Sequence, residues 1–243
     1  MKPLIQKGKL TVIEGNIEPH LRRVLDTTRD MLAKLGSAAK ITIRDLAAAS
    51  QVSPATLYNR FGDKDSLLTF VTLEHFEKSA GRAFASDSGG APLERIETGL
   101  RLIEQECEQN PALARSLTEL YFRLGSNRSL RPLLYRAIFD SLKNPLAAMR
   151  CDNLLQDWIS VDALCIEICD RAFSIIHRWV QNDIPQNAIG DHLVFSTDSL
   201  LLGALRQEHR HTIEQRIRKI LDKPGFTTRL LPEGEQNNDK VQH

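Results

Sequence analysis

The feature that most constrains this fold is a pair of short helices joined by a tight turn, encoded between Thr42 and Phe61. Thr42 stands where a helix N-cap belongs, and Asp45 follows three residues later as a short-armed capping-box partner. Ser53 and Pro54 mark a second helix start, because Ser caps a helix and Pro has no N–H to lose at the first helical position. Neither helix can bury a core alone, so the chain must supply a third helix across them.

The third helix is predicted between Pro19 and Leu35, directly before the pair. Its inward positions recur three and four residues apart, which places them on one helical face: Leu21, Val24, Leu25, Thr28, Leu32 and Leu35. Gly36 ends this helix, because glycine readily takes the left-handed conformation found there. Leu57 and Phe61 face the same core from the second short helix. The other residues of that helix are expected to face solvent or a partner: Ser53, Pro54, Ala55, Thr56, Tyr58, Asn59 and Arg60.

This stretch resembles the helix-turn-helix domain of the TetR family of bacterial transcriptional repressors. The resemblance covers about residues 20–80 and rests on Val52-Ser53, Thr56-Leu57-Tyr58, Phe61 and Lys64 at their intervals, together with the residues of the first short helix. The matching residues of that first helix, and Leu67 beyond the second, are Thr42, Arg44, Asp45, Leu46, Ala47 and Leu67. Three positions depart from the family pattern. Gln51 and Ala55 stand where the family often has Gly, and Arg60 stands where many members have His or another polar residue.

The resemblance implies that the second short helix enters the DNA major groove. Tyr58 is expected to donate its hydroxyl to a phosphate, and Lys64 to bind phosphate beside a helix N-terminus. Arg60 is the candidate for reading a guanine, with phosphate pairing left open. Plain alternatives remain: Tyr58 packs in the domain, Lys64 is a solvated charge, or Arg44 pairs with a nearby acid. The residues expected at DNA are Thr42, Arg44, Ser53, Pro54, Ala55, Thr56, Tyr58, Asn59, Arg60 and Lys64.

The whole chain is predicted to be all-α, with no strand pattern and no repeat. We expect a flexible N-terminal arm over residues 1–18 and a three-helix DNA-binding domain over 19–85. A helical effector-binding and dimerisation domain follows over 91–223, and a polar tail over 224–243. The arm is either disordered or contributes Lys2, Lys7 and Lys9 to DNA contacts. Later helices are expected to begin at Pro92, at Pro111 and near Ser129, and Pro145 is expected to kink or end the last of these.

Two later helices, over residues 161–180 and 189–205, carry apolar stripes that are too wide for a helix covered on one side only. We therefore expect them to dimerise with their symmetry mates as a four-helix bundle, and the family resemblance implies the same. A dimer would present two recognition helices, which predicts a palindromic operator. The candidate interface residues are Phe173, Ile176, Trp179, Val180, Leu193, Leu200, Leu201 and Ala204.

The resemblance also implies a small-molecule effector that binds in the C-terminal domain and releases the DNA. The helix from Lys64 to Phe84 is expected to transmit the change, as a shift between two populations. An aromatic content of 6% favours an aliphatic or acyl ligand over a flat cation. The candidate lining residues are Glu104, Cys107, Phe122, Phe139, Phe173 and His177.

Composition excludes a global basic surface, because the formal net charge is only +1. DNA binding must then depend on a local patch. Cys165 and Cys169 lie one helical turn apart, with Cys107 expected nearby, which leaves metal or redox sensing open against their being small buried hydrophobes. No metal motif appears, and no cofactor is expected. Neither a signal peptide nor a long apolar run is present, so we expect a cytoplasmic protein.

Two other classes of protein are alternatives to a regulator. A helical enzyme would need a phosphate loop, a nucleophile motif or Glu-x-x-His pairs, and none of these occurs. A helical adaptor with a degenerate DNA-binding domain stays open because of Gln51. The sequence therefore predicts a homodimeric, sequence-specific DNA-binding transcriptional regulator, a repressor rather than an enzyme.

Overall fold

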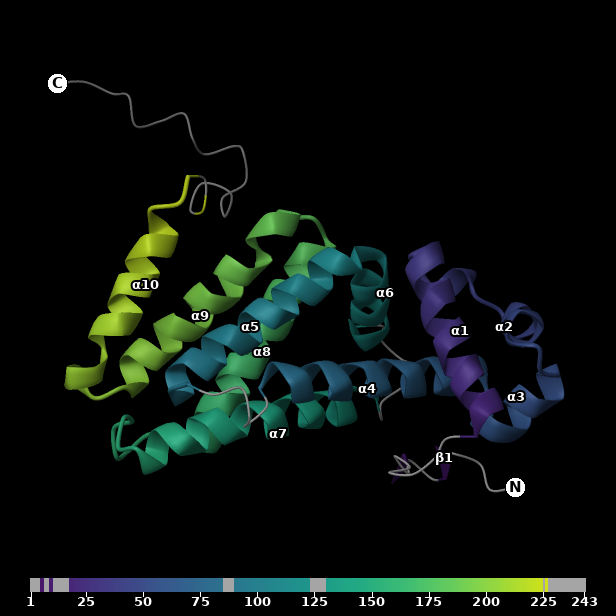
Figure 1. Ribbon diagram of the computed structural model, residues 1–243, viewed down its shortest axis with the longest axis horizontal. Helices are drawn as coiled ribbons and strands as arrows, with labels where there is room; N and C mark the ends of the chain where they lie inside the picture. Colours follow the sequence, from purple (N-terminus) through teal and green to yellow (C-terminus); the bar gives the residue numbers. More distant parts are fainter. Residues whose placement is uncertain are drawn as a thin grey trace. The chain divides into compact units, whose positions relative to one another are not determined.

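The computed structural model describes residues 5–6, 9–10, 18–84, 90–122, 130–224 and 226 (Figure 1). Most of these residues are helical, which confirms the predicted all-α class. Most of the predicted N-terminal arm, residues 85–89 and most of the polar tail lie outside the described residues. The chain divides into two compact units, one of residues 1–88 and 105–142 and the other of residues 89–104 and 143–243.

The first unit contains the helix-turn-helix. Its helices begin and end close to where the sequence predicts, because caps and glycines mark most of their ends. Gly36 closes the first helix in the left-handed conformation, at φ 64°. The helices wholly within this unit are α1 (Pro19–Leu35), η1 (Ala38–Lys40), α2 (Ile43–Ser50), α3 (Pro54–Phe61), α4 (Lys64–Ala83) and α6 (Pro111–Phe122).

Helix α6 belongs to the core of this first unit, which moves the unit boundary from where the sequence placed it. Leu113 and Leu117 are buried in one cluster with Val24, Leu57 and Leu67. The α6 hydroxyl of Ser116 donates to the Leu32 carbonyl of α1 over 3.3 Å. Helix α6 therefore packs with the N-terminal helices, although the sequence assigns it to the later domain.

A short pair of strands precedes α1, which the sequence did not predict. β1 (Ile5–Gln6) pairs with β2 (Lys9–Leu10) in an antiparallel ladder, with Ile5 opposite Leu10 and Gln6 opposite Lys9. Two residues on each side are too few to change the class of the fold.

Helices α5 (Pro92–Gln109) and α7 (Leu130–Cys151) each have one part in each unit. Pro145 lies inside α7 and does not end it, so that one of the two outcomes predicted for this proline is wrong. Leu142, Leu146 and Met149 continue the apolar spacing across the proline and are buried. Their burial offsets the backbone hydrogen bond that a proline removes.

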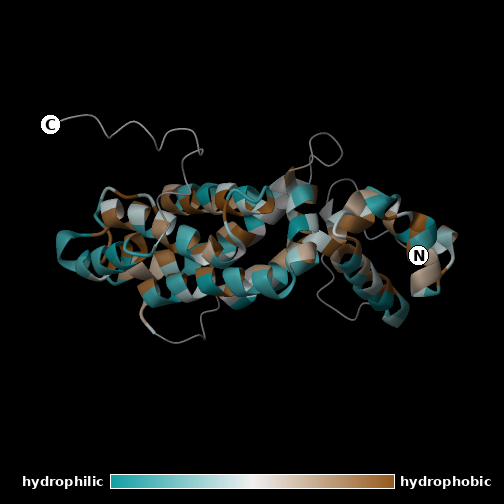
Figure 2. Ribbon diagram, turned by 90° about the horizontal axis from the view of Figure 1, so that it is seen from above, coloured by the Kyte–Doolittle hydropathy of each residue, from teal (hydrophilic) through white to brown (hydrophobic). Residues whose placement is uncertain are grey.

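The second unit is built on α8 and α9, which lie side by side (Figure 1). Hydrophobic and hydrophilic residues alternate along the ribbons of the helices (Figure 2). Most of the residues buried in the core are hydrophobic. Phe226 stacks on His192 at a ring distance of 4.6 Å, so one residue of the predicted polar tail is buried. The elements wholly within this unit are α8 (Val161–Val180), η3 (Gln186–Ala188), α9 (Ile189–Ala204), η4 (Gln207–His209) and α10 (His211–Leu221).

Ion pairs that involve two buried carboxylates tie the helices of the second unit together. Asp198 of α9 accepts two hydrogen bonds from the Arg216 guanidinium of α10, at 2.5 and 2.6 Å. The same guanidinium donates to Glu97 of α5 at 2.5 Å. Asp191, at the start of α9, binds Arg101 at 2.9 Å and Lys223 at 2.6 Å. Both acids of α9 are thus used inside the unit. Across the described residues, no helix is long and apolar enough to span a membrane.

Candidate DNA-binding surface

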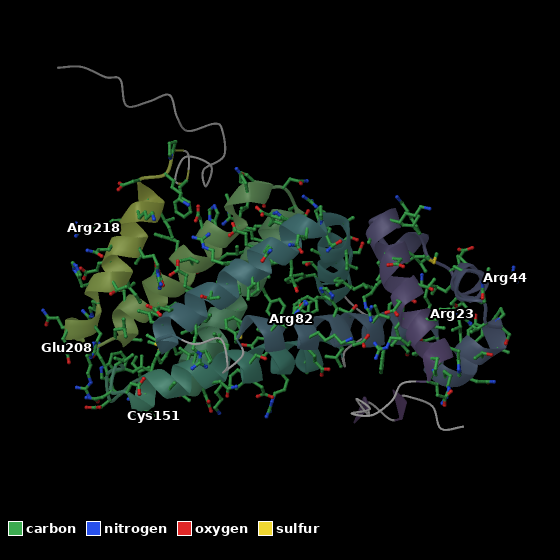
Figure 3. All side chains as sticks on the ribbon, in the orientation of Figure 1. Arg23, Arg44, Arg82, Cys151, Glu208 and Arg218 are labelled. Atoms are coloured by element: carbon green, nitrogen blue, oxygen red, sulfur yellow. The ribbon has the colours of Figure 1, made fainter. Side chains whose placement is uncertain are left out.

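The start of α2 has the capping geometry that the sequence predicts. The Thr42 hydroxyl accepts a hydrogen bond from the Asp45 amide over 3.2 Å and donates to the Asp45 carboxylate over 2.6 Å. This satisfies an amide that the first turn of a helix otherwise leaves unpaired. Arg44 is exposed between them and points away from the helices (Figure 3).

The turn between α2 and α3 has the left-handed backbone conformation that glycine usually adopts, although no glycine occurs there. Gln51 adopts φ 56° and ψ 41°, in the left-handed region. A residue with a side chain loses roughly 1–2 kcal/mol there. The Val52 amide still closes the turn by donating to the Ala47 carbonyl at 3.0 Å. The departure at Gln51 therefore strains the turn and leaves its shape unchanged.

Helix α3 is capped and anchored as predicted. The Ser53 hydroxyl accepts from the Thr56 amide at 3.1 Å, and Pro54 occupies the first helical position. Leu57 and Phe61 are buried, and the Phe61 ring meets Phe70 edge to face at 6.1 Å. One face of α3 is thereby fixed to the core, and the opposite face is left outward.

The outward face of α3 presents small and polar groups together with one aromatic ring. Pro54, Ala55 and Asn59 are exposed, and Tyr58 is 53% exposed. Exposure to that degree rules out the alternative that Tyr58 packs in the domain. An aromatic ring with a hydroxyl, presented beside small side chains, fits the backbone contacts of a duplex.

Arg60 corrects the sequence interpretation. Its side chain was expected to face outward, but the residue is only 6% exposed, and its guanidinium donates to the Glu18 carboxylate at 2.6 Å. A hydrogen bond from Arg60 and the charge of its guanidinium lower the pKa of Glu18. The prediction that Arg60 faces outward is wrong, because periodicity places the Cβ atom but not the end of a long side chain. Glu18, immediately before α1, is the partner that the sequence did not reveal.

Lys64 also has a structural role that the sequence missed. Its ammonium group donates to the Ile41 carbonyl at 3.0 Å, across the segment that leads into α2. The side chain is half-buried, so it is not the solvated surface charge of the plain alternative. Lys64 joins the beginning of α4 to the beginning of α2, beside Thr42 and Arg44.

A cluster of charges holds α4 to α1. Glu74 of α4 binds Arg22 and Arg29 of α1, the latter at 2.5 Å, and also Lys78 at 2.8 Å. Burial alone would raise the pKa of Glu74, but hydrogen bonds from Lys78, Arg22 and Arg29 outweigh it and lower this pKa to about 2. The carboxylate therefore stays ionised, and any displacement of α4 acts directly on α1.

The predicted ligand-lining residues are divided between the two units. Cys107, Phe122 and Phe139 belong to the first unit, and Glu104, Phe173 and His177 belong to the second. The Glu104 carboxylate accepts a hydrogen bond from the Gly190 amide at 3.1 Å, at the first turn of α9, and pairs with Arg101. A Cβ atom at Gly190 would lie 2.1 Å from that carboxylate, so glycine is needed for this approach.

The predicted dimer residues are mostly core. Six of them are buried within their own chain, which leaves them no surface for a partner: Phe173, Trp179, Val180, Leu193, Leu201 and Ala204. Ile176 and Leu200 alone of the predicted set are partly exposed. The wide apolar stripes that suggested a partner are largely explained by contacts between the helices of the second unit.

Cys107, Cys165 and Cys169 are buried like small hydrophobes, whereas Cys151 is exposed. Cys165 and Cys169 are free thiols in the buried core, and the hydrogen bond between them, together with burial, raises the pKa of the Cys165 thiol. A thiol held protonated is a poor nucleophile and a poor metal ligand. Within the part of the chain that the structure describes, no group of three His, Cys, Asp or Glu residues could hold a metal ion.

Known proteins identify the family to which this arrangement belongs. The model for bacterial regulatory proteins of the tetR family matches residues 24–69, from within α1 to the first turns of α4. The chain is 30% identical over 182 residues to the HTH-type transcriptional repressor KstR of Rhodococcus jostii (strain RHA1), across 75% of this chain and 82% of KstR. The chain belongs to the TetR family. This membership makes it a transcriptional regulator rather than an enzyme.

Solved TetR-family structures share the fold at lower identity. One is FadR of Thermus thermophilus, a TetR-family repressor in complex with lauroyl-CoA, with a TM-score of 0.61, 19% identity, and coverage of 76% of this chain and 95% of that one. Another is the complex of SmeT with triclosan, with a TM-score of 0.59, 16% identity, and coverage of 78% and 93%. SmeT is the repressor of a multidrug efflux pump in Stenotrophomonas maltophilia.

Proposed function

We propose that this TetR-family regulator is a homodimeric repressor that binds a palindromic operator through α3 and leaves it when a small molecule binds. The observation that carries the proposal is the outward face of α3, where Tyr58 and Asn59 stand exposed on a helix fixed by its cap and by Leu57 and Phe61. The DNA target makes the cytoplasm its place of action.

The proposed DNA contacts surround that face. Pro54 and Ala55 offer apolar contact to thymine methyl groups, and Asn59 can hydrogen-bond a base edge. Tyr58 and Arg44 serve the phosphates, together with the first turns of α2 and α4 at Thr42 and Lys64. Ser53 and Thr56 hold the cap that aims the helix. Arg60 is left out of this set because Glu18 already holds it.

Gel-shift titration with DNA from upstream of the chain's own gene tests this proposal. Tyr58→Ala should weaken binding by the same factor on every sequence, because a phosphate contact carries no sequence information. Asn59→Ala should instead reduce the preference for the operator over scrambled DNA. Arg136→Ala, which removes an exposed ion pair on α7, is the control and should bind like the wild type. An unshifted operator at micromolar protein would contradict the proposal.

The proposed dimer surface is the outward side of α9. Every residue on that side that is at least partly exposed is uncharged: Phe195, Ser196, Ser199, Leu200, Leu202 and Gly203. The two acids of α9, Asp191 and Asp198, are turned inward into ion pairs. A helix whose outer side faces solvent normally carries charged residues on that side. A neutral side also meets its own copy across a two-fold axis without like-charge repulsion.

Sedimentation of a charged variant tests the dimer. Ser199→Arg places a guanidinium at the centre of the neutral side, and in a symmetric dimer it would place two of them there. The variant should sediment as a monomer and bind the operator at least about 100-fold more weakly, because the second recognition helix is lost. Gln215→Arg, on the exposed side of α10, is the matched control and should remain a dimer. A dimeric Ser199→Arg variant would contradict this surface.

The proposed effector is a small molecule with an aliphatic or acyl part, bound among the C-terminal helices. FadR of T. thermophilus with lauroyl-CoA and SmeT with triclosan support a ligand of this size, although each ligand belongs to its own protein. The effector must bind more tightly to a form whose recognition helices are wrongly spaced. The charge cluster at Glu74 gives α4 a direct hold on α1.

Release of bound operator by a panel of ligands tests the effector class. Acyl-CoA thioesters of increasing chain length should release operator DNA with an affinity that rises with length, by about 0.8 kcal/mol for each buried methylene. Free coenzyme A is the control. Release by planar cations alone would contradict the aliphatic assignment.

The alternative of a helical adaptor with a degenerate DNA-binding domain depended on Gln51. The left-handed turn is retained at that residue, which argues against a degenerate domain.

A further inference from the structure

A short segment between α7 and α8 is fixed in place although it is not helical. Arg150 donates to the carbonyl groups of Gln156, at 3.0 Å, and of Ile159. Arg206 donates to the Leu155 carbonyl at 3.2 Å and binds the Asp157 carboxylate at 2.6 Å. Two arginines, one near the end of α7 and one just after α9, therefore hold its backbone, and Leu155 within it is buried.

Trp158 stands on this fixed segment with 74% of its surface exposed. Its indole N–H donates to the Gln156 side-chain oxygen at 2.7 Å. The apolar indole ring is therefore exposed to solvent, although its one polar group already has a hydrogen-bond partner. Burying such a ring removes a large apolar area from water without leaving an unpaired donor.

The segment is joined to the neutral side of α9 through a single residue. The Gln156 amide nitrogen donates to the carbonyl of Gly203, at 3.0 Å, and to that of Leu205, at 3.3 Å, while the same side chain accepts from Trp158. The Gln156 backbone amide donates to the Ala204 carbonyl at 2.9 Å. Trp158 is thus one side chain away from the last turn of α9, where the neutral side ends.

We propose that Trp158 is an anchor of the subunit contact, buried by a second copy of this chain. The proposal rests on the dimer proposed above and adds a residue that lies outside α9. The occupant is a second copy of the chain, because the neutral side of α9 can contact the same side of another copy without charge repulsion. That side continues directly to Trp158. Because the segment is already fixed and the indole N–H is already paired, Trp158 loses little conformational freedom when it is buried in a contact. Tryptophan is also among the residues that most often dominate an interface.

The chain contains two tryptophans, and their exposure differs completely, which makes the test direct. Trp179 is fully buried, so iodide in solution can quench only Trp158. In the wild-type dimer, sized by sedimentation, we expect iodide to quench almost no fluorescence. In the Ser199→Arg monomer, we expect a quenchable fraction that disappears when Trp158→Phe is added. Trp158→Ala should raise the dissociation constant of the dimer at least about 30-fold, as removal of an anchor does.

Leu221→Ala is the matched control, because Leu221 is an exposed apolar residue on α10, and it should change that constant by less than about 3-fold. A wild-type dimer whose Trp158 is fully quenched would overturn the proposal while leaving the dimer intact. Shielding of Trp158 in the Ser199→Arg monomer would also overturn it, because the chain itself would then cover the ring. A wild-type chain that sediments as a monomer would overturn the proposed dimer as well, so the two failures are distinguishable.

Discussion

Arg60 and Glu18 fix the end of the recognition helix to the beginning of α1. The guanidinium is almost fully buried, and its hydrogen bond to Glu18 spans 42 residues of sequence. Such a contact controls the direction of α3 rather than the chemistry of its outer face. Arg60 is therefore a positioning residue in the proposed DNA complex.

Variants of this pair should separate positioning from base reading. We expect Arg60→Met to weaken operator and mismatched DNA by similar factors, and Glu18→Gln to do the same to a smaller extent. The double variant should lose no more than Arg60→Met alone, since both changes remove one contact. Fluorescence anisotropy on single-base operator variants measures this. If Arg60→Met erased the preference at one base pair and Glu18→Gln did not, Arg60 would read a base.

Ser53 combines a structural and a functional role in one hydroxyl. Ser53→Ala should lower the free energy of unfolding by about 1 kcal/mol, because the Thr56 amide loses its cap. Ser53→Asp should keep that stability, since aspartate caps as well as serine does, yet bind DNA more weakly because its charge faces phosphate. Urea denaturation and gel shifts on the two variants measure the two effects. Equal DNA affinity for Ser53→Asp and wild type would place Ser53 away from the duplex.

At the scale of elements, α4 is held to α1 by a carboxylate whose pKa is far below its ordinary value of 4.5, at about 2. A depressed carboxylate pKa stabilises the folded state above the unfolded pKa, and the contribution is lost as the pH falls towards the folded pKa. The contribution of Glu74 is therefore complete at pH 7 and declines below about pH 4.5.

We expect Glu74→Gln to be less stable than wild type at pH 7, with a difference that shrinks by at most about 2 kcal/mol on going to pH 3. Urea denaturation followed by circular dichroism at both pH values measures the difference. Asp140→Asn is the control, because Asp140 forms an exposed pair with Arg136 and should show little change. A constant difference between the two pH values would mean that the ion pairs at Glu74 contribute nothing.

The sequence predicted most helix ends and few of the long-range contacts. Caps and glycines are local signals, so Thr42, Ser53 and Gly36 could be placed directly. Pro145 does not end its helix, contrary to one of its two predicted outcomes, because the apolar spacing on both sides outweighs a local breaker. The reach of Arg60 to Glu18 and the burial of Phe226 depend on residues distant in sequence, which periodicity does not contain.

For the whole molecule, the division into two units and the placement of the aromatic residues allow each unit to be followed separately. Both tryptophans, Trp158 and Trp179, belong to the second unit, and the three tyrosines belong to the first: Tyr58, Tyr121 and Tyr135. Tryptophan fluorescence therefore reports the second unit alone. A single unfolding free energy is not well defined when two units unfold at different denaturant concentrations.

Asp198→Ala should act on the second unit. It leaves the Arg216 charge buried beside Glu97 alone, and loss of one partner of a buried pair costs about 3 kcal/mol. The tryptophan transition should move to lower urea by about 1 M or more. Asp140→Ala, which removes an exposed partner, should leave that transition in place. An unmoved transition in Asp198→Ala would mean that the pair contributes nothing to the stability of this unit.

The neutral outer side of α9 has a consequence for which chains can assemble together. Many interfaces exclude a wrong partner by placing like charges opposite each other. The outer side of α9 has no charged residue among Phe195, Ser196, Ser199, Leu200, Leu202 and Gly203. In a cell that makes several related regulators, only shape would then keep this chain from forming mixed pairs with them. Such a heterodimer would carry two different recognition helices and would bind an operator that neither homodimer binds.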